Sequence, residues 1–382
     1  MKLKLLVPAE KSGVQYWRTW TPLWELQKRG LVELRTFDVK GFTSKEVAEG
    51  IKWCDAVVGR GFSGKAGWSL LRQYQELGKP VFVDHDDFNY DIDPLNKAYA
   101  WYGTEEVELE DPKTGERSWL WKDGVDGFNL KENRLNAGGR MGCMQEAALF
   151  TTTTPYLKDR FKELTGREDI IVIPNAINKA LWKPVPNSRE KYADGFRFGW
   201  FISDSHGSDL LYIREALKDF LEQHKDAKLV IMGDYGGVDL DGYFPKDQIE
   251  THPFCDLYTD HYPTVAACLG LDVAIAPLAH TEFNRCKSPL KFAEYTYLGY
   301  PCILENIETY SPYVTDGEHA LLAGNPTEWK MALNQLYHDK GLRAKLRFNA
   351  LQICDLFFDN SRVCLDWLNA YKMILNRETI VT

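Results

Sequence analysis

The sequence has no long apolar run, no closely paired cysteines and no strongly basic region. None of its 382 residues belongs to a run approaching the roughly 18 apolar residues that a membrane-spanning helix needs. The eight cysteines are scattered singly, so we interpret them as small core side chains in a reducing compartment. The apolar start at 1–8 lacks a small-residue cleavage site and predicts a strand, not a signal peptide. We therefore expect a cytoplasmic protein with no membrane span.

Acidic residues outnumber basic ones across the chain. There are 46 Lys and Arg against 55 Asp and Glu, which gives a formal net charge of −9. Residues 1–175 hold 25 basic and 27 acidic residues, and the remainder holds 21 and 28. Neither half is the basic domain expected of a protein held to nucleic acid mainly by phosphate contacts. A nucleic-acid ligand would need a local basic groove.

Short apolar runs alternate with helical patterns along both halves of the chain, which predicts alternating strands and helices. The first series of runs lies at 3–7, 32–37, 56–59, 80–83, 149–152 and 170–173. The second series lies at 196–201, 228–232, 249–252, 272–276 and 301–304. This alternation is typical of parallel sheets covered by helices on both faces. At roughly 100–200 residues per domain, the length favours an α/β fold with two Rossmann-like domains.

A proline-rich segment at 174–186 separates the two series and predicts a domain boundary. We place the first domain at 1–178 and the second at 190–355. The remaining chain is helical in pattern, and we expect the helix within 356–382 to cross back to the first domain.

An insertion interrupts the first domain at about 100–128. Apolar runs at 107–109 and 118–121 flank a turn-like segment, Asp111-Pro112-Lys113-Thr114-Gly115, which predicts an inserted β-hairpin. The hairpin is either surface decoration or a flap over an acceptor.

The strongest chemical signal follows the apolar strand at 272–276. A loop leads from it to a helix that we expect to begin with Ser288 as N-cap and Pro289 in the first turn. The free N–H groups and the positive dipole end of such a helix suit a diphosphate. The alternative is an ordinary capped helix with solvated lysines.

Charged side chains gather around the start of this helix. Arg285, Lys287 and Lys291 add positive charge at the same point of the chain. Glu294 lies in the second turn, where a carboxylate can accept hydrogen bonds from a ribose diol. These residues and Ser288 are our main candidates for binding a nucleotide.

A second loop of this kind follows the strand at 196–201. Small polar residues, Ser203-Asp204-Ser205-His206-Gly207-Ser208, precede a helix and present backbone donors to an anion. His206 could neutralise phosphate charge if protonated, or could be a solvated loop residue. The helix is expected to bury Leu210, Leu211, Ile213 and Leu217.

Four polar residues, Asp84-His85-Asp86-Asp87, come directly after the strand at 80–83. Carboxylates at the carboxyl ends of strands in an open α/β sheet are well placed for chemistry. Asp84 and Asp86 could hold a divalent cation, or one of these groups could orient or deprotonate an acceptor hydroxyl. The remaining alternative is an N-cap with solvated loop charges.

The loop after the first strand contains Ser12 and Gly13, and glycine permits a tight turn near a ligand. The helix after it carries Arg18, which could equally be an exposed helical arginine. We expect Trp17, Trp20 and Trp24 on the buried side of this helix.

Together these segments resemble the retaining glycosyltransferases of the two-Rossmann-domain (GT-B) type, family 4 or group 1, and in particular divergent members carried by large bacteriophages. The resemblance covers nearly the whole chain. Its most specific motif is Phe283-Asn284-x-Cys286-Lys287-Ser288-Pro289-Leu290-Lys291-x-x-Glu294-Tyr295, preceded by Ala276-Pro277-Leu278 and followed by Leu298-Gly299-x-Pro301. The supporting motifs are Gly13-Val14-Gln15-Tyr16-Trp17-Arg18, Val83-Asp84-His85-Asp86-Asp87, Ile173-Pro174-Asn175-Ala176-Ile177 and Gly199-Trp200.

The resemblance implies a nucleotide-sugar donor, here a UDP-sugar, held mainly by the second domain, and an acceptor held mainly by the first. Glu294 matches the second glutamate of the family's E-x7-E pattern, but Cys286 replaces the first. The basic pair usual after the first strand of the second domain is also missing, and His206 and Ser208 stand in that region. Lys287 and Lys291 would then take over the diphosphate charge. Transfer with retention, and without a metal, is implied.

From this resemblance we assign the site residues. The catalytic candidates are Asp84, His85, Asp86 and Lys287. The donor-binding candidates are Gly13, His206, Ser208, Arg285, Lys287, Ser288, Lys291 and Glu294. The acceptor-binding candidates are Tyr16, Trp17, Arg18 and Asp87.

The acceptor is less defined than the donor. Resemblance to phage enzymes suggests a hydroxylated or hydroxymethylated pyrimidine in DNA, for which a basic groove would come from Arg60, Lys65, Lys122, Lys131, Arg134 and Arg140. Two other functions stay open: a nucleotide-sugar epimerase on the same fold, and a non-catalytic nucleotide-sugar binder.

Overall fold

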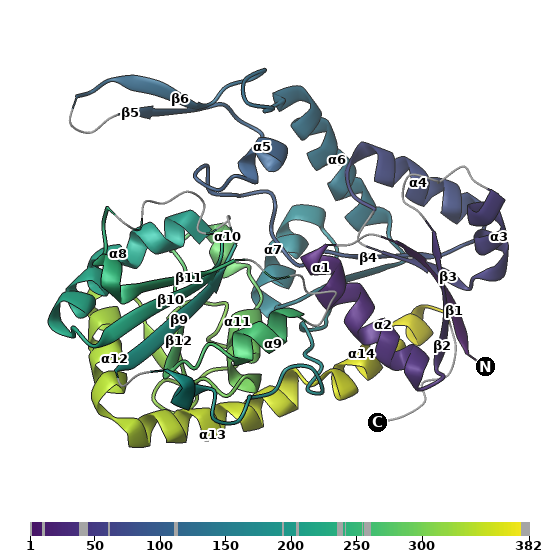
Figure 1. The fold of residues 1–382 in the computed structure, drawn as a ribbon. Helices are drawn as coiled ribbons and strands as arrows, with labels where there is room; N and C mark the ends of the chain where they lie inside the picture. Colours follow the sequence, from purple (N-terminus) through teal and green to yellow (C-terminus); the bar gives the residue numbers. More distant parts are fainter. Residues whose placement is uncertain are drawn as a thin grey trace.

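Two six-stranded sheets dominate the protein, each wrapped by helices, and a thin two-stranded arm projects from one of them (Figure 1). The computed structural model describes residues 2–9, 12–37, 45–59, 62–110, 114–192, 195–203, 206–234, 240, 242–253, 255 and 261–375. Some positions considered from the sequence lie outside this range, namely Arg60, the turn residues 111–113, Asp204, Ser205 and the chain end at 376–382.

The first sheet is parallel and has the strand order β2-β1-β3-β4-β7-β8. Its strands are β1 (Leu3–Pro8), β2 (Val32–Phe37), β3 (Ala56–Val58), β4 (Val81–Asp84), β7 (Leu149–Thr152) and β8 (Ile171–Val172). The helices around it are α1 (Gly13–Gln15), the π-helical turn η1 (Tyr16–Trp20), α2 (Thr21–Lys28), α3 (Lys45–Trp53), α4 (Gly64–Glu76), α5 (Tyr99–Tyr102), α6 (Leu130–Glu146) and α7 (Pro155–Thr165).

The second sheet is also parallel and has the order β11-β10-β9-β12-β13-β14. Its strands are β9 (Phe196–Ile202), β10 (Ala227–Gly233), β11 (Ile249–His252), β12 (Val273–Ala276), β13 (Cys302–Glu305) and β14 (Leu321–Ala323). Its helices are η3 (Arg189–Lys191), α8 (Gly207–Gln223), η5 (Lys246–Gln248), α9 (His261–Ala267), α10 (Glu282–Arg285), α11 (Leu290–Tyr297), α12 (Pro326–His338) and α13 (Lys340–Phe357). The two sheets confirm the predicted pair of Rossmann-like units, and β14 is a strand that the sequence pattern does not predict.

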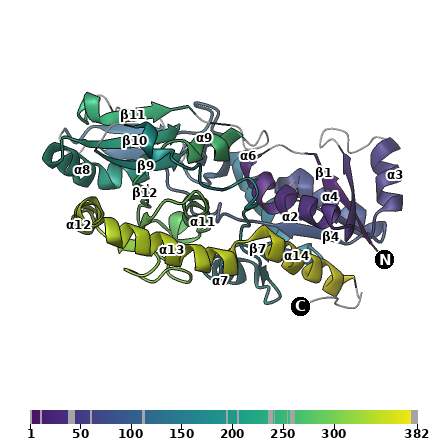
Figure 2. The same ribbon diagram turned by 60° about the horizontal axis from the view of Figure 1, so that its bottom comes forward.

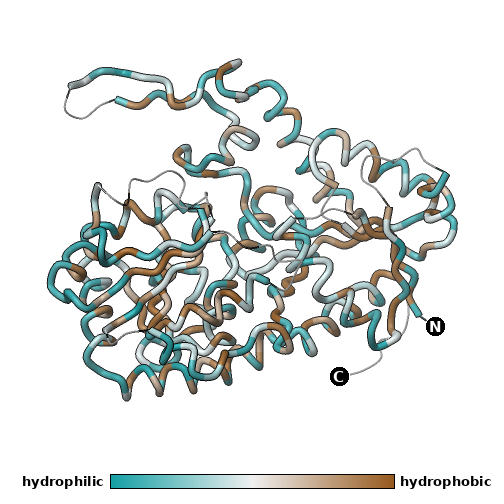
Figure 3. Tube along the Cα trace, viewed as in Figure 1, coloured by the Kyte–Doolittle hydropathy of each residue, from teal (hydrophilic) through white to brown (hydrophobic). Residues whose placement is uncertain are grey.

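The central strands are almost completely buried because helices cover both faces of each sheet. Every residue of β9 is buried, and so is every residue of β4, β7 and β12. Figure 3 shows these strands as brown segments inside more hydrophilic helices. Two predictions of burial were wrong: Trp24 is 44% exposed and Leu211 is 41% exposed. Each lies at the edge of its helix's apolar face, where a helical period fixes the side only approximately.

The insertion forms the predicted hairpin, with β5 (Val107–Glu110) antiparallel to β6 (Arg117–Trp121). Figure 1 shows it reaching away from the first sheet, above the second. At its base, Val107 and Trp121 pack with Tyr99, Phe128 and Phe283, and Phe283 belongs to α10 of the second unit.

The chain passes between the two units twice, at neighbouring places. Ile177 donates a backbone hydrogen bond to Phe358 and accepts one from Asn360, at 2.7 and 3.0 Å. The last helix, α14 (Asn360–Ile374), then packs on the first unit, where Trp367 and Tyr371 join the core formed by β1 (Figure 2).

Candidate functional site

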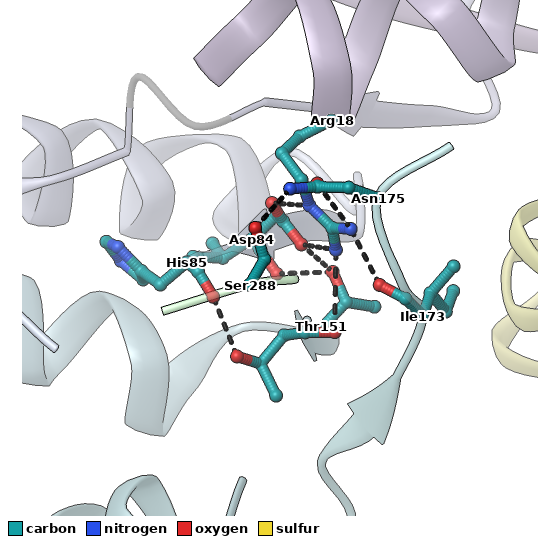
Figure 4. Close-up of polar contacts among 9 residues, drawn as sticks. Arg18, Asp84, His85, Thr151, Ile173, Asn175 and Ser288 are labelled. Atoms are coloured by element: carbon teal, nitrogen blue, oxygen red, sulfur yellow. Dashed lines mark hydrogen bonds and ion pairs between the residues drawn. The ribbon is translucent and has the colours of Figure 1, made fainter. Parts of the chain in front are cut away.

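A buried ion pair occupies the carboxyl end of β4. Arg18 binds Asp84 through two nitrogens, with Nε–Oδ2 at 2.9 Å and Nη2–Oδ1 at 2.7 Å (Figure 4). Its guanidinium also donates to the Ile173 carbonyl at 2.6 Å, and the Thr151 hydroxyl donates to Asp84 Oδ1 at 2.6 Å. The Arg18 side chain is 0% exposed. Arg18 is therefore not the exposed helical arginine considered above, and its donors are directed at the protein itself.

This pair is connected to the second unit through Asn175. The Asn175 carboxamide oxygen accepts a hydrogen bond from Arg18 Nη1 at 3.3 Å, and its nitrogen donates to Ser288 Oγ at 2.7 Å. Figure 4 shows Asn175 between Arg18 and Ser288. The polar chain thus runs from the end of β4 to the loop before α11. It gives Ser288 a partner in the domain crossing.

The predicted N-cap is wrong by one position. Helix α11 begins at Leu290 with Pro289 as N-cap, and the Ser288 side chain makes no capping bond to the helix. The Ser288 hydroxyl instead receives the hydrogen bond from Asn175. The interdomain contact therefore takes priority over local capping.

The residues after Asp84 differ in burial and surroundings. His85 is 4% exposed, and its ring lies near the rings of Phe150 and Phe161, with centroids 6.1 and 6.2 Å away. Figure 4 shows its imidazole directed away from Arg18. Asp86 is 7% exposed. Asp87 is half-buried. The pKa of the Cys286 thiol in the second unit is raised mainly by burial, and the negative charge of Asp87 adds to that rise.

Tyr16 and Trp17 lie where the first unit meets the second, and Gly13 is an exposed residue shortly before them in the chain. Gly13 begins α1, whose N-cap Ser12 accepts a hydrogen bond from the Gln15 amide. Tyr16 and Trp17 are buried in one apolar cluster with residues of the second unit, and the Trp17 ring lies 5.4 Å from that of Trp182. Both aromatic residues hold the units together in this structure.

A buried aspartate in the second unit, Asp209, accepts several hydrogen bonds and was not among the residues predicted from the sequence. Asp209, in the first turn of α8, is 1% exposed. Its Oδ1 accepts hydrogen bonds from the Ala279 amide at 2.7 Å and the Asn284 side chain at 2.8 Å. Its Oδ2 lies 2.7 Å from His206 Nδ1. Burial tends to raise the pKa of Asp209, but the Lys287 ammonium and the His206 hydrogen bond outweigh it and the pKa is lowered.

Lys287 lies beside Asp209. Its Nζ is 4.0 Å from Asp209 Oδ2 and 5.2 Å from the centre of the Phe283 ring. The side chain is only 15% exposed, and Nζ has no hydrogen-bond partner among the described residues. An ammonium has three donors, and leaving them unused in a buried place is costly. The arrangement suits an anionic ligand.

Lys291 and Glu294 form a second pair on α11. Lys291 Nζ lies 2.9 Å from Glu294 Oε2 and 3.4 Å from the Tyr262 hydroxyl. The Glu294 side chain is 3% exposed. Burial raises the pKa of Glu294, and the Lys291 ammonium opposes that rise.

The remaining donor candidates are placed differently. Burial, followed by the charge of Lys287, lowers the pKa of His206, so the imidazole is neutral near pH 7. The expectation of a protonated His206 facing phosphate is therefore not supported. Ser208 lies in the first turn of α8. Arg285 pairs with Glu308 at 2.6 Å and is not joined to the two lysines by any contact within the described residues.

The loop that carries Lys287 is fastened to the first unit on its other side. The Glu282 carboxylate accepts a hydrogen bond from the Tyr156 hydroxyl at 3.1 Å and lies 2.7 Å from Arg160 Nε. Cys286, the departure from the family pattern, is fully buried in the apolar core of the first unit. An unpaired carboxylate at this position would lose its solvation there. The small thiol therefore suits this packing better than the glutamate of the family pattern.

The described part of the chain contains no candidate metal centre. No group of three or more His, Cys, Asp or Glu residues there is placed to hold a metal ion. Of the groove candidates, Arg140 is buried at 5% exposure, which removes it from any surface groove. Lys65, Lys122, Lys131 and Arg134 are exposed. Among the described residues, no helix is both long enough and apolar enough to cross a membrane.

Comparison with solved structures defines the fold class: two Rossmann-like units of the GT-B arrangement. Sucrose-phosphate synthase from Thermosynechococcus elongatus is similar with a TM-score of 0.67 and 11% identity, over 98% of this chain and 100% of that chain. HepE from Anabaena, solved with UDP and glucose, has a TM-score of 0.65 and 14% identity, over 97% and 99%. A glycosyltransferase from Rickettsia africae has a TM-score of 0.66 and 15% identity, over 99% and 100%. No family model matches the chain, and no curated protein does.

Proposed function

We propose that the chain is a glycosyltransferase that moves a sugar from a nucleotide diphosphate to a hydroxyl acceptor. The GT-B fold and the UDP bound by HepE support a UDP-sugar donor. The observation that carries the proposal is the Lys287 ammonium, which is nearly buried and has no hydrogen-bond partner among the described residues. It lies at the carboxyl edge of the second sheet, where α/β folds bind nucleotides.

In this proposal the second unit, 190–355, holds the donor. Lys287 and Lys291 neutralise the diphosphate, Ser288 and the start of α11 add backbone and hydroxyl donors, and Glu294 binds the ribose. His206 and Asp209 position Lys287 and the Ala279 loop through their mutual hydrogen bond. Gly13 lets the backbone approach the donor closely. Ser208 lies in the first turn of α8, whose backbone N–H groups face the donor in this proposal.

The first unit, 1–178, holds the acceptor, with Asp87 and His85 or Asp86 nearest the chemistry. Arg18 and Asp84 are positioning residues, because their polar atoms bind each other and the backbone. Tyr16 and Trp17 shape the boundary between the units.

Transfer proceeds with retention in this proposal. The bond between the anomeric carbon and the diphosphate oxygen breaks while the acceptor oxygen bonds to the same face of that carbon. The acceptor's proton passes to the departing phosphate oxygen, so the step needs neither a protein nucleophile nor a metal. Lys287 stabilises the negative charge that develops on the leaving group. The packed units exclude water from the reacting atoms.

The proposal is tested by UDP binding to the full chain, measured by calorimetry. Lys287→Ala is expected to weaken binding at least about tenfold, or roughly 1.4 kcal/mol. Arg285→Ala is the matched control, because this neighbouring cation pairs with Glu308 and is expected to leave UDP affinity unchanged. Failure of the wild-type chain to bind UDP, GDP or dTDP, alone or as their sugars, rejects the proposal.

An epimerase on the same fold is separated from a transferase by its substrates. An epimerase converts the nucleotide sugar with no acceptor present, whereas a transferase consumes it productively only when an acceptor is added. Incubating the protein with each UDP-sugar alone, and then with hydroxymethylated duplex DNA or small hydroxylated acceptors, distinguishes the two. Binding without turnover in every mixture identifies a non-catalytic binder.

A further inference from the structure

The first unit contains a buried cation without a counter-charge among the described residues. Arg140, on α6, is 5% exposed. It forms no ion pair with any described residue, and its Nε and Nη2 have no hydrogen-bond partner there. A buried ion without its partner is strongly unfavourable.

The surroundings of Arg140 are aromatic. Its guanidinium carbon lies 4.8 Å from the centre of the Tyr102 ring and 5.6 Å from that of Tyr90. Burial raises the pKa of Tyr90 to about 12, with Arg140 opposing the rise by its charge and by hydrogen bonding. The phenol is therefore neutral at physiological pH. Cation–π contacts with two rings offset only part of the cost of removing a guanidinium from water.

The unused nitrogens are the pair that arginine presents to a carboxylate or phosphate. In this chain, Arg18 binds Asp84 through Nε and Nη2, and Arg72 and Arg167 bind Glu146 and Asp169 through the same two atoms. This edge of the guanidinium matches two oxygens of one oxyanion. In Arg140 the same edge is buried and has no acceptor among the described residues.

The position of Arg140 places this edge on the acceptor side. One face of α6 holds the segment after Asp87: Asn133 donates to the Ala100 and Gly103 carbonyls at 3.0 Å, and Tyr90 donates to the Ala137 carbonyl at 2.9 Å. Residues three, four and seven apart share a helix face, so Arg140 continues this row. Phe88, next to Asp87, packs on Tyr90 with ring centres 5.9 Å apart.

We propose that Arg140, framed by Tyr90 and Tyr102, binds a compact oxyanion, a phosphate or carboxylate, that is part of the acceptor. The inference rests on the proposed function and narrows its acceptor to a small anionic molecule. The neighbouring insertion, about 100–128, carries eight acidic and three basic residues, which disfavours a polyanion such as a nucleic-acid duplex.

The test uses the full chain saturated with UDP, so that the diphosphate site is occupied. Inorganic phosphate and acetate are titrated separately, and binding is followed by the melting temperature. A ligand that binds only the folded state stabilises it in proportion to the logarithm of its concentration. At ten times its dissociation constant, phosphate stabilises the folded state by about 1.4 kcal/mol and is expected to raise Tm by roughly 3–6 °C.

Two variants and one control separate the roles of Arg140. Arg140→Met, similar in length but uncharged, is expected to lose the phosphate response and to melt no lower than wild type in anion-free buffer. Arg140→Lys keeps the positive charge but loses the paired N–H donors of the guanidinium. It is expected to weaken phosphate binding at least about tenfold. Lys131→Met, at an exposed position of the same helix, is expected to respond like wild type.

The outcomes decide between the sources of the anion. A response to phosphate alone indicates a phosphorylated acceptor, and a response to acetate as well admits a carboxylate. The inference is overturned if Arg140→Met responds like wild type, if it melts markedly lower without anions, or if only duplex DNA produces a response. UDP binding with no anion response rejects this inference alone. An Arg140-dependent response in a chain that binds no nucleotide rejects the proposed function and keeps the anion site.

Discussion

Replacing Arg18 with methionine leaves the Asp84 carboxylate buried without its cation. The guanidinium is 0% exposed and the carboxylate 10% exposed, so water cannot replace the lost partner. Removing one member of a buried ion pair costs about 3–5 kcal/mol. At roughly 2–4 °C per kcal/mol for units of this size, Tm is expected to fall by roughly 6–20 °C.

The matched control is Arg72→Met. Arg72 also binds one carboxylate, Glu146, through Nε and Nη2, but the two side chains are 53% and 33% exposed. Exposed pairs contribute about 0.2–1 kcal/mol, so this variant is expected to lose less than about 4 °C. The two pairs share the same two-nitrogen geometry but differ in burial, and Arg18 also donates to the Ile173 carbonyl and to Asn175.

Thermal melting by circular dichroism, at one pH and one salt concentration, measures both variants. Adding Asp84→Asn to Arg18→Met is expected to recover part of the loss, because the isolated buried charge is removed. Equal losses for the Arg18 and Arg72 variants would refute the reasoning. The reasoning would also be refuted if the double variant melted lower than Arg18→Met by as much as Asp84→Asn lowers Tm on its own.

Three further predictions concern the second unit and its contact with the first. Lys287→Ala is expected to lower turnover at least about tenfold, or roughly 1.4 kcal/mol, and unchanged turnover removes Lys287 from the mechanism. Transfer is expected to continue in excess EDTA, and loss that added Mg²⁺ restores contradicts the metal-free step. Because the pKa of His206 is lowered on folding, the unfolded chain binds more protons below its ordinary pKa of about 6.5. The contribution of His206 to the free energy of unfolding is therefore fully present above that pH and is lost as the pH falls below it. His206→Asn is expected to flatten the fall in Tm between about pH 6.5 and 5. An unchanged slope counts against a buried neutral imidazole.

The repeated alternation of strands and helices is enough to predict both sheets, because it is a periodic signal spread over many residues. Strand β14, Leu321–Ala323, is not predicted, although the equally short β3 is. The buried side of a helix is predicted less well, as Trp24 and Leu211 show.

Individual side-chain contacts are harder to foresee. The sequence marks Lys287, Lys291 and Glu294 because charge gathers around a helix start, whereas Asp209 lies far earlier in the chain and shares no local pattern with them. An acidic residue in the first turn of α8 is the available signal, but it is common at any helix start. Likewise, nothing near Arg18 in the chain indicates that its partner is Asp84, since the pair forms only when β4 and the helix after β1 are packed together.

The placement of α14 affects the order in which the protein can fold during synthesis. The core around β1 includes Trp367 and Tyr371, and the Tyr371 ring stacks on Phe82 of β4 at 5.2 Å. One large core of the second unit, by contrast, uses only residues between Phe196 and Leu346. On the ribosome, the amino-terminal half therefore emerges first but must wait for the last helix to complete its core, whereas this one core of the second unit has all its residues by Leu346. A fragment that ends near residue 178 is expected to expose this apolar surface and to depend on chaperones.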